Sequence, residues 1–512
     1  MLLPSSRLRL ARTATAGLTA LAVGRPAVLA LTGPGTPSAG VTQQQRLALE
    51  QFDYAQENVL GTSLDLAVLA ARPGDAVRCQ EAVLTEIERL RAILSTYDPA
   101  SEISRVSLGL QSATSPELVQ LLAAYDDWSA RTGGAVDARL ANVMRLWRDA
   151  ACTGRLPADA DLRAALIAPG ALNVDALGKA RIIDRAVELA RRLVPAGLLN
   201  IGGDLRAWGD ATWQVGVADP RQPAENAPLL TTFALRNAAV ATTGDYARPL
   251  TVAGRDYSHL IDPRTLAPVE KVSSATVVAS DCVTANALAA AASVLGGPAA
   301  SMLIQLHQAM GHLVLDREGG DFRGGIFGTA ATEDPFAVPG SPPRPDAPKV
   351  AAPAPASLWP KDFQVSVTVA LKAQMGGRGG KRPYMAVWVE DANHKLVRTI
   401  SVFGTAQKYL PELTNWWSLV RGNQAASRSV TRATRPAGEY TVVWDGFDTS
   451  GKPVPRGDYT VFIEINREHG SHVVQSAKIA CADVAVAVPP LNATSESDSA
   501  KFGYGPKPAP AK

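Results

Sequence analysis

Cysteine and histidine are scarce in this sequence, which contains four cysteines and six histidines in 512 residues. The cysteines show no CxxC spacing and have no histidines close by, which disfavours a zinc site built on sulfur. They could form disulfides in an oxidising compartment, but buried free thiols are the expectation for a chain this large. The four are Cys79, Cys152, Cys282 and Cys481.

A long run of one charge is also absent. The 51 Lys and Arg and 48 Asp and Glu residues give a net charge of +3 that is spread along the chain. This distribution disfavours a nucleic-acid-binding track and a general polyanion-binding surface. Because single cores rarely exceed about 250–300 residues, the length and the 46% apolar content predict two folded domains.

The first forty residues have the order of a secretory signal. Arg7, Arg9 and Arg12 precede an apolar stretch at residues 13–24, which Arg25 then interrupts. We therefore expect residues 1–40 to be a signal peptide, with a disordered leader as the alternative. A signal peptide implies a periplasmic or cell-envelope protein, and membrane association is expected only through this leader.

Helical and strand-like patterns alternate between residues 45 and 330, which predicts one mixed α+β domain. The helical patterns are clearest at Glu81–Ser95 and Asp184–Leu193, and the strand-like runs at Ser63–Ala70, Trp213–Ala218 and Ala275–Ala279.

The second half of the chain has a different composition. Residues 331–360 are rich in Pro and Ala and are expected to form an extended linker. Residues 361–485 contain β-rich runs of strand length, which predict an all-β sandwich. Within it, residues 448–458 (DTSGKPVPRGD) are expected to form a hairpin-type turn, and residues 486–512 a disordered tail. The β-rich runs are Phe363–Leu371, Tyr384–Glu390, Val397–Val402, Gly438–Trp444, Asp458–Arg467 and Val473–Ala480.

A series of short phrases in the first half carries a family resemblance. The phrases are GTSLDLAV (61–68), STYDPASEISRVS (95–107), GGAVDARL (133–140), NVDALGKARIIDRA (173–186), NIGGDLRAWG (200–209), ATTGDYARPL (241–250), YSHLIDPRT (257–265) and TANALAAAASVLG (284–296). In this order and spacing they resemble the ApbE-like FAD:protein FMN transferases. The β-rich second domain resembles a domain of unknown function that is often fused to such transferases.

The resemblance implies an enzyme that takes FAD as substrate, uses Mg²⁺ and modifies a partner protein. A threonine hydroxyl of the partner attacks the FMN-side phosphorus of FAD, and AMP leaves. His259 is the candidate catalytic group near the attacking hydroxyl, because a neutral imidazole accepts a proton near neutral pH. The alternative is that His259 only anchors its loop through Asp262.

The resemblance also places the metal site, and here the sequence departs from the family. The backbone-carbonyl ligand falls on Gly178, while the family Asp and Thr ligands fall on Asn286 and Ala290. Asn lacks the negative charge and Ala offers no ligand, so Mg²⁺ affinity should be weakened. Asp281 is an alternative ligand, although a carboxylate at the start of a helix more often caps it.

The flavin-contact positions of the family are only partly kept. Tyr97 matches an aromatic residue that lies against the flavin ring, and Leu266 replaces a Gly, so the turn after DPRT has no residue that readily adopts positive φ. The complete set of implied flavin contacts is Leu60, Tyr97, Ala135, Val136, Asp137, Asp175, Arg181 and Leu260.

Three functional hypotheses follow. The first is an exported FAD:protein FMN transferase that is impaired by the loss of its metal ligands. The second is a non-catalytic flavin-binding or scaffold protein of the cell envelope, which the changes at Asn286 and Ala290 favour. The third makes the β-rich domain a partner-binding module, with Trp416 and Trp417 as contacts, although paired tryptophans more often belong to a core.

Overall fold

The computed structural model describes residues 49–222, 224, 226–227, 229–244, 250–328, 358–372, 382–404, 407–421, 431–432, 434–467 and 471–507. The expected leader at 1–40 lies outside the described residues, as do residues 331–357 of the expected linker. No helix in the described part of the chain is both long and apolar enough to span a membrane.

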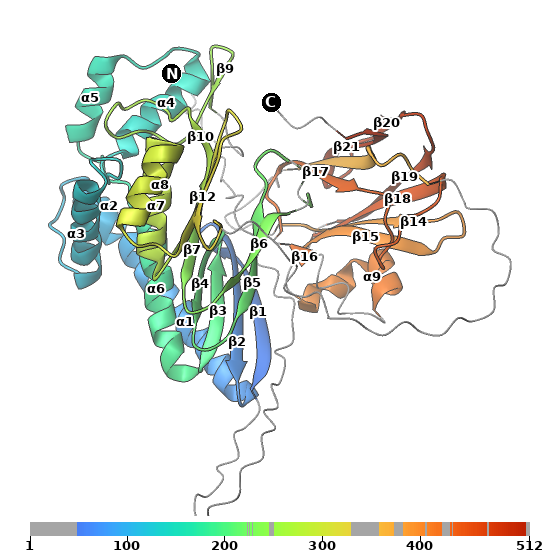
Figure 1. Ribbon diagram of the computed structural model, residues 1–512, viewed down its shortest axis with the longest axis horizontal. Coiled ribbons are helices and arrows are strands. Elements are labelled where there is room, and N and C mark those ends of the chain that lie inside the picture. The colour runs from blue at the N-terminus through green and yellow to red at the C-terminus, as the bar shows by residue number, and fades with distance from the viewer. Residues whose placement is uncertain are drawn as a thin grey trace, which may run out of the picture.

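The N-terminal domain is built on an eight-stranded sheet in which every neighbouring pair is antiparallel. Its strand order is β1-β2-β3-β4-β7-β10-β11-β12 (Figure 1). The strands are β1 (Glu50–Val59), β2 (Thr62–Ala70), β3 (Ala196–Ile201), β4 (Asp204–Trp208), β7 (Ala239–Gly244), β10 (Val272–Ala279), β11 (Gly311–Asp316) and β12 (Asp321–Gly325). Two short hairpins accompany it, β5 (Trp213–Ala218) with β6 (Leu229–Leu235), and β8 (Leu250–Val252) with β9 (Arg255–Tyr257).

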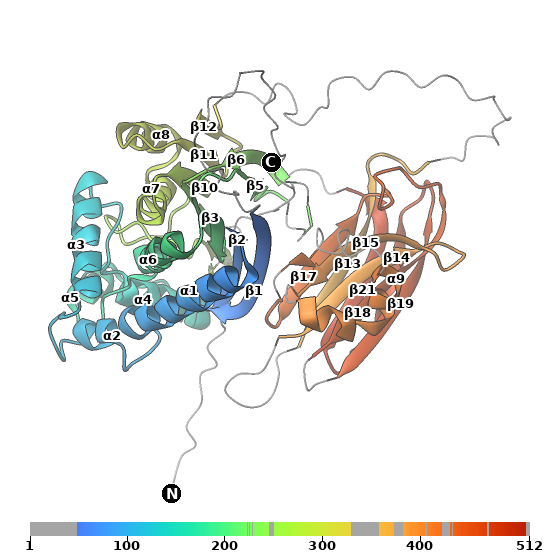
Figure 2. The ribbon, with the colours of Figure 1, turned by 90° about the horizontal axis from the view of Figure 1, so that it is seen from below.

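Helices cover one face of this sheet and the β5–β6 hairpin packs on the other (Figures 1 and 2). The helices are α1 (Pro73–Leu94), α2 (Glu102–Ser107), α3 (Pro116–Arg131), α4 (Ala141–Thr153), α5 (Asp159–Ile167), α6 (Asp175–Leu193), α7 (Cys282–Leu295) and α8 (Gly297–Leu306). Helix α7 is alanine-rich and buries most of its residues, and α6 buries about half of its own, which allows the two helices to pack closely against each other and the sheet. The predicted α+β class is confirmed.

The C-terminal domain is a sandwich of two sheets around its own core. The four-stranded sheet has the order β17-β13-β21-β20 and the five-stranded sheet β16-β15-β14-β18-β19. The strands are β13 (Phe363–Leu371), β14 (Tyr384–Glu390), β15 (Leu396–Phe403), β16 (Thr431–Arg432), β17 (Gly438–Trp444), β18 (Gly457–Asn466), β19 (His472–Cys481), β20 (Val486–Leu491) and β21 (Ser497–Pro506). A 3₁₀ turn at Gln407–Glu412 and helix α9 (Thr414–Val420) cover the outer face of the second sheet, with Trp416 fully buried there.

Two expectations for the C-terminal domain are wrong. Residues 486–507 are not a disordered tail but form β20 and β21, and β21 pairs with β13 along its whole length. The segment folds because Ala500, Phe502 and Tyr504 alternate inward and fill the sandwich core. The 448–458 segment does not form a hairpin between β17 and β18, because these strands belong to different sheets. The chain does turn back on itself there, with an antiparallel bridge between Phe447 and Pro453.

The end of the expected linker is part of the second domain. Trp359 is buried and packs edge-to-face on Trp444 and Tyr504, so residues 358–360 are anchored to the sandwich. The two domains lie side by side, with β1 and the β5–β6 hairpin toward the sandwich (Figures 1 and 2). The Asn226 side chain joins them by exchanging two hydrogen bonds, of 2.6 and 2.7 Å, with the backbone of Val443.

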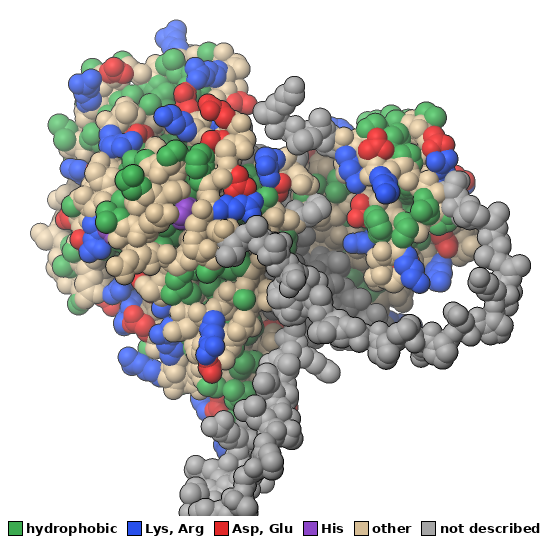
Figure 3. Space-filling view, in the orientation of Figure 1, with side chains coloured by type: hydrophobic (Ala, Val, Ile, Leu, Met, Phe, Trp, Pro, Cys, Tyr) green, Lys and Arg blue, Asp and Glu red, His purple; other side chains and the backbone are tan. Residues whose placement is uncertain are grey.

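The surface mixes both signs of charge on the face shown in Figure 3, where basic and acidic side chains are interspersed on both domains. The four cysteines are free thiols, buried at Cys79, Cys282 and Cys481 and exposed at Cys152.

Candidate functional site

The start of α6 brings two of the predicted flavin-contact residues together. Asp175 is the first residue of the helix, and its carboxylate accepts hydrogen bonds from the Thr96 hydroxyl at 2.7 Å and the Tyr97 hydroxyl at 3.0 Å. Tyr97 is 76% exposed, and an exposed aromatic ring is a group on which a planar ligand could stack. The structure thus fixes the direction of the Tyr97 ring through Asp175.

The loop at residues 133–139 lies against the same end of α6. The backbone amide of Asn173 donates to the Ala138 carbonyl at 2.6 Å. Ala135 and Val136 are buried in the main core, so their side chains serve packing. Burial raises the pKa of Asp137, but hydrogen bonds from the Arg139 guanidinium and amide outweigh it and hold that pKa below its usual value. Asp137 is therefore ionised at neutral pH.

The loop after β9 carries the predicted catalytic group. His259 and Leu260 are half-buried, and the Leu260 amide donates to the Ser258 hydroxyl at 3.0 Å. The Asp262 carboxylate accepts from the Arg264 guanidinium at 2.8 and 2.9 Å. Leu266 closes the loop, because its carbonyl accepts the Trp147 indole N–H at 2.9 Å.

Two turns within the sheet lie beside each other, and an ion pair links the second of them to α6. Leu60 and Gly61 have positive φ of 50° and 80° and form the two-residue turn between β1 and β2. The Gly202 amide donates to the Ser63 carbonyl at 3.1 Å, which places the β3–β4 turn beside it. Lys179 of α6 then forms a 2.7 Å ion pair with Asp204, which is almost fully buried.

The predicted metal ligands lie on neighbouring helices but do not form a metal site. The Asn286 amide group donates to the Cys282 carbonyl one turn earlier at 3.1 Å, and Ala290 has no ligand atom. Asp281 caps α7 by accepting from the Thr284 amide at 2.8 Å, as the capping alternative predicts. Among the described residues, no group of three or more His, Cys, Asp or Glu could hold a metal ion. Together with the carbonyl of Gly178, the side chains present do not fit a Mg²⁺ ion held by the protein.

A half-buried carboxylate beside these turns has an unusual pKa. Burial and the nearby Glu57 charge raise the pKa of Asp65 to about 6, despite a hydrogen bond from Asn200 at 3.2 Å. Asp65 lies within the GTSLDLAV phrase and Asn200 opens the NIGGD phrase, so the two segments also touch through side chains.

Sequence reasoning missed three polar groups that shape this region. Thr96 holds Asp175, and the buried Tyr125 hydroxyl accepts the Leu177 amide of α6 at 3.2 Å. Asp184 accepts from the backbone amides of Cys282 and Val283, which fixes α7 to α6. Thr96 and Asp184 stand inside the recognised phrases and could have been noticed there, whereas nothing in the sequence marks Tyr125.

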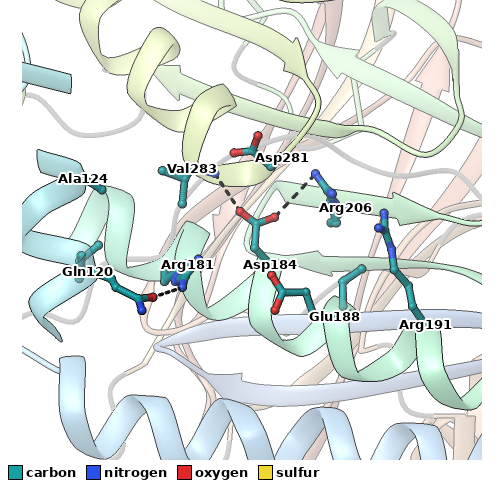
Figure 4. Close-up of a pocket in the computed structure, with 11 residues that line it drawn as sticks. Gln120, Ala124, Arg181, Asp184, Glu188, Arg191, Arg206, Asp281 and Val283 are labelled. Atoms are coloured by element: carbon teal, nitrogen blue, oxygen red, sulfur yellow. Dashed lines mark hydrogen bonds and ion pairs between the residues drawn. The ribbon is translucent and has the colours of Figure 1, made fainter. Parts of the chain in front are cut away.

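Two hollows open near α6. A groove of about 430 Å³ lies between α3, α6, β4 and the start of α7 (Figure 4). A smaller one of about 200 Å³ is lined by Tyr125, Asp137 and Arg139 among others. Of the predicted flavin contacts, the larger groove contains only Arg181, whose guanidinium donates to Gln120 at 2.6 Å.

Comparisons with known proteins agree with the motif series. Residues 60–314 match the model of the ApbE family, and residues 364–496 match a family described as predicted periplasmic protein (DUF2271). A FAD:protein FMN transferase of Haemophilus influenzae is 25% identical over 274 residues, which cover 47% of this chain and 78% of that protein. One of Vibrio cholerae is 25% identical over 270 residues, covering 46% of this chain and 79% of that protein.

A crystal structure of the ApbE protein from Thermotoga maritima aligns with 25% identity and a TM-score of 0.47, covering 54% of this chain and 97% of that one.

Proposed function

We propose that this chain, an ApbE-like flavin transferase domain followed by a DUF2271 domain, transfers FMN from FAD to a threonine of a partner protein. The match of residues 60–314 to the ApbE family carries the proposal, together with relatives that are named FAD:protein FMN transferase. An exported, periplasmic location belongs to the same proposal, supported by the description of the second family and by the basic, then apolar, N-terminal sequence.

In the proposed reaction, the threonine oxygen forms a bond to the FMN-side phosphorus of FAD, and the bond from that phosphorus to the oxygen of AMP breaks. His259 takes the proton of the threonine hydroxyl. The protein's other contribution is positioning: the exposed Tyr97 ring offers a stacking surface, and Asp175 holds that ring in place. No step runs through a protein-held metal ion, because the side chains of Asn286 and Ala290 do not fit one.

The lost ligands predict a slow enzyme. An amide that is hydrogen-bonded to its own helix cannot neutralise phosphate charge as a carboxylate with bound Mg²⁺ would. The test is AMP release from FAD by the full chain, with and without Mg²⁺, in the natural protein and in the double variant Asn286→Asp with Ala290→Thr. We expect the double variant to gain Mg²⁺-dependent AMP release of at least about tenfold, since removing such charge stabilisation lowers rates by that much or more.

Each single variant is a control, because one restored ligand should give less than the pair. Adding His259→Ala to the double variant should lower AMP release without abolishing FAD binding. Failure of both the natural protein and the double variant to bind FAD would overturn the proposal.

A non-catalytic flavin-binding role is the second candidate. The same observation favours it, namely that Asn286 and Ala290 leave α7 without an acidic or hydroxyl ligand at these positions. It is supported if the natural protein binds FAD tightly and releases no AMP, while the double variant does.

A further inference from the structure

The groove between α3, α6, β4 and α7 is lined by an unusual density of charged side chains. Residues far apart in the sequence meet there, and Figure 4 shows them arranged around one opening. Three are arginines and three are carboxylates, while apolar side chains line the remainder with Gln120. The lining consists of Gln120, Leu121, Ala124, Arg181, Asp184, Val187, Glu188, Arg191, Arg206, Asp281 and Val283.

The three carboxylates already have partners of their own. Asp184 accepts from the amides of Cys282 and Val283 at 3.0 and 3.1 Å, and Asp281 caps the same helix. Glu188 forms an ion pair with Arg185, which does not line the groove. Arg185 thus neutralises Glu188 from outside the groove. The three lining arginines then exceed the remaining two carboxylates, and the groove retains an excess of positive charge.

The arginines, in contrast, retain unused donors. The Nε atoms of Arg181 and Arg206 are buried and, within the described part of the chain, have no hydrogen-bond partner. The Arg206 side chain is only 11% exposed, and its Nη1 lies 3.8 Å from the Asp184 carboxylate. A buried guanidinium N–H without an acceptor is energetically unfavourable, so an acceptor that enters the groove would be bound favourably.

Arg191 adds a third positive charge at the exposed rim. Its Nη2 donates to Asn237 at 2.9 Å, and burial followed by the Arg206 charge lowers the pKa of Arg191. One anion placed between two guanidinium groups that repel each other across a groove reduces their repulsion and stabilises both.

We propose that this groove is a binding site for a phosphate group. Arg191 of α6 and Arg206 of β4 come from two elements and approach from different directions, which suits an anion with more than two acceptor oxygens. Arg181 lies ten residues before Arg191 on α6, a rise of about 15 Å, and lines the other end of the groove. The Arg191 end of the groove lies away from the predicted metal position, because Arg191 is thirteen residues beyond Gly178 on α6, a rise of about 20 Å, whereas Arg181 is only three residues beyond it. The phosphate is either free in solution or part of a nucleotide.

The experiment is a calorimetric titration of the full chain with inorganic phosphate, at constant ionic strength in chloride. We expect saturable binding of one phosphate. Arg206→Gln and Arg191→Gln should each weaken this binding about tenfold or more, because each variant loses one charged hydrogen bond to the phosphate. Arg192→Gln is the matched control, because it removes the same charge from the same turn of α6 without touching the groove. Thermal unfolding of each variant checks folding, and the exposed Arg191 provides a test even if Arg206→Gln proves unstable.

Competition identifies the source of the phosphate group. If FAD or FMN displaces inorganic phosphate, the groove takes the phosphate of the nucleotide, and if both bind together the site is separate from the flavin. Either result supports the site, provided that Arg206→Gln and Arg191→Gln weaken binding more than Arg192→Gln. Absent phosphate binding, or equal affinity in all three variants and the natural protein, would overturn it, whatever the outcome of the AMP-release assay.

Discussion

Leu266 combines a left-handed backbone with a buried side chain. Its φ is 61°, a conformation that favours glycine, yet its side chain is only 6% exposed and packs in a cluster with Trp147 and Ile261. The family resemblance places Gly at this position. The turn keeps a positive φ although Leu266 replaces that Gly. Burial of the leucine side chain offsets a strain of about 1–2 kcal/mol.

This balance predicts an unusual order of stability at position 266. Leu266→Ala should lower the free energy of unfolding by about 2–4 kcal/mol, because it loses the buried side chain and keeps the strain. Leu266→Gly loses the same contacts but relieves about 1 kcal/mol of strain, so it should be more stable than the alanine variant. Urea denaturation measures the order, and an alanine variant more stable than the glycine variant would show that strain is negligible.

Asp65 predicts a pH dependence of stability. Its pKa in the folded protein is about 6, against 3.8 for the unfolded chain, because burial and the Glu57 charge disfavour the ionised form. A raised carboxyl pKa means that the folded state binds the proton more tightly. The resulting stabilisation is fully present below pH 4 and is lost as the pH rises through 6.

The variant Asp65→Asn imitates the protonated carboxyl group. It should be more stable than the natural protein at pH 7, by up to about 3 kcal/mol, and equal to it near pH 4. Unfolding free energies at several pH values measure this difference. Asp149→Asn, at an exposed position of α4, is the control and should change stability by less than about 0.5 kcal/mol at any pH. A constant difference between Asp65→Asn and the natural protein would contradict the raised pKa.

At the scale of elements, α7 is held by two carboxylates at its first turn. Asp281 caps it from its own N-terminus, and Asp184 of α6 accepts two further backbone amides. These contacts satisfy donors that a helix leaves unpaired at its start. They also fix the relative position of α6 and α7, on which every predicted metal position lies.

Loss of the cap should therefore affect stability rather than metal dependence. Asp281→Ala should lower the unfolding free energy by about 1 kcal/mol, while Asp281→Ser, which keeps a capping oxygen, should lower it by less than half of that. Asp184→Ala should lower it by about 2 kcal/mol or more, because two amides lose their acceptor. If Asp281→Ala instead removed a Mg²⁺ response of AMP release at unchanged stability, Asp281 would be a metal ligand after all.

The elements that could be predicted from the sequence are those with a strong local pattern. The bounds of β13, β14 and β17 coincide with their β-rich runs, because alternating Val, Thr and aromatic residues fit a half-buried strand. The first half of α6 was not predicted as helix from the local sequence pattern, because Asp175 and Gly178 weaken that pattern. The candidate site stays a prediction drawn from the series of family phrases. The arginine groove could not be predicted from the sequence, because its residues meet only after α3, α6 and β4 have packed together.

At the scale of the whole molecule, the two domains have separate hydrophobic cores. Among the described residues, the buried members of the main N-terminal core run from Val59 to Val314, with Phe322 packed against them, and the sandwich core begins at Trp359. Polar contacts such as the Asn226–Val443 pair join the domains. A small number of polar contacts between domains does not couple their folding. We therefore expect the two domains to unfold in separate transitions.

The last strand of the chain decides whether the second domain folds. β21 lies between β13 and β20, and it contributes Ala500, Phe502 and Tyr504 to the sandwich core. A chain that ends at residue 485 loses this strand, exposes one side of β13 and leaves Trp359 without its contact to Tyr504. Removal of residues 508–512 alone touches none of these contacts and is the matched control.

We therefore expect the chain ending at residue 485 to lose the calorimetric transition of the C-terminal domain and to expose Trp444, whereas the chain ending at 507 should retain both. FAD binding, which is proposed for the N-terminal domain, should survive in both chains, because no residue of the main core is removed. Two intact transitions in the shorter chain would mean that the sandwich closes without β21. Loss of both transitions would mean that the N-terminal domain depends on its neighbour for stability, and that the contacts through Asn226 and Val443 do more than align two independent units.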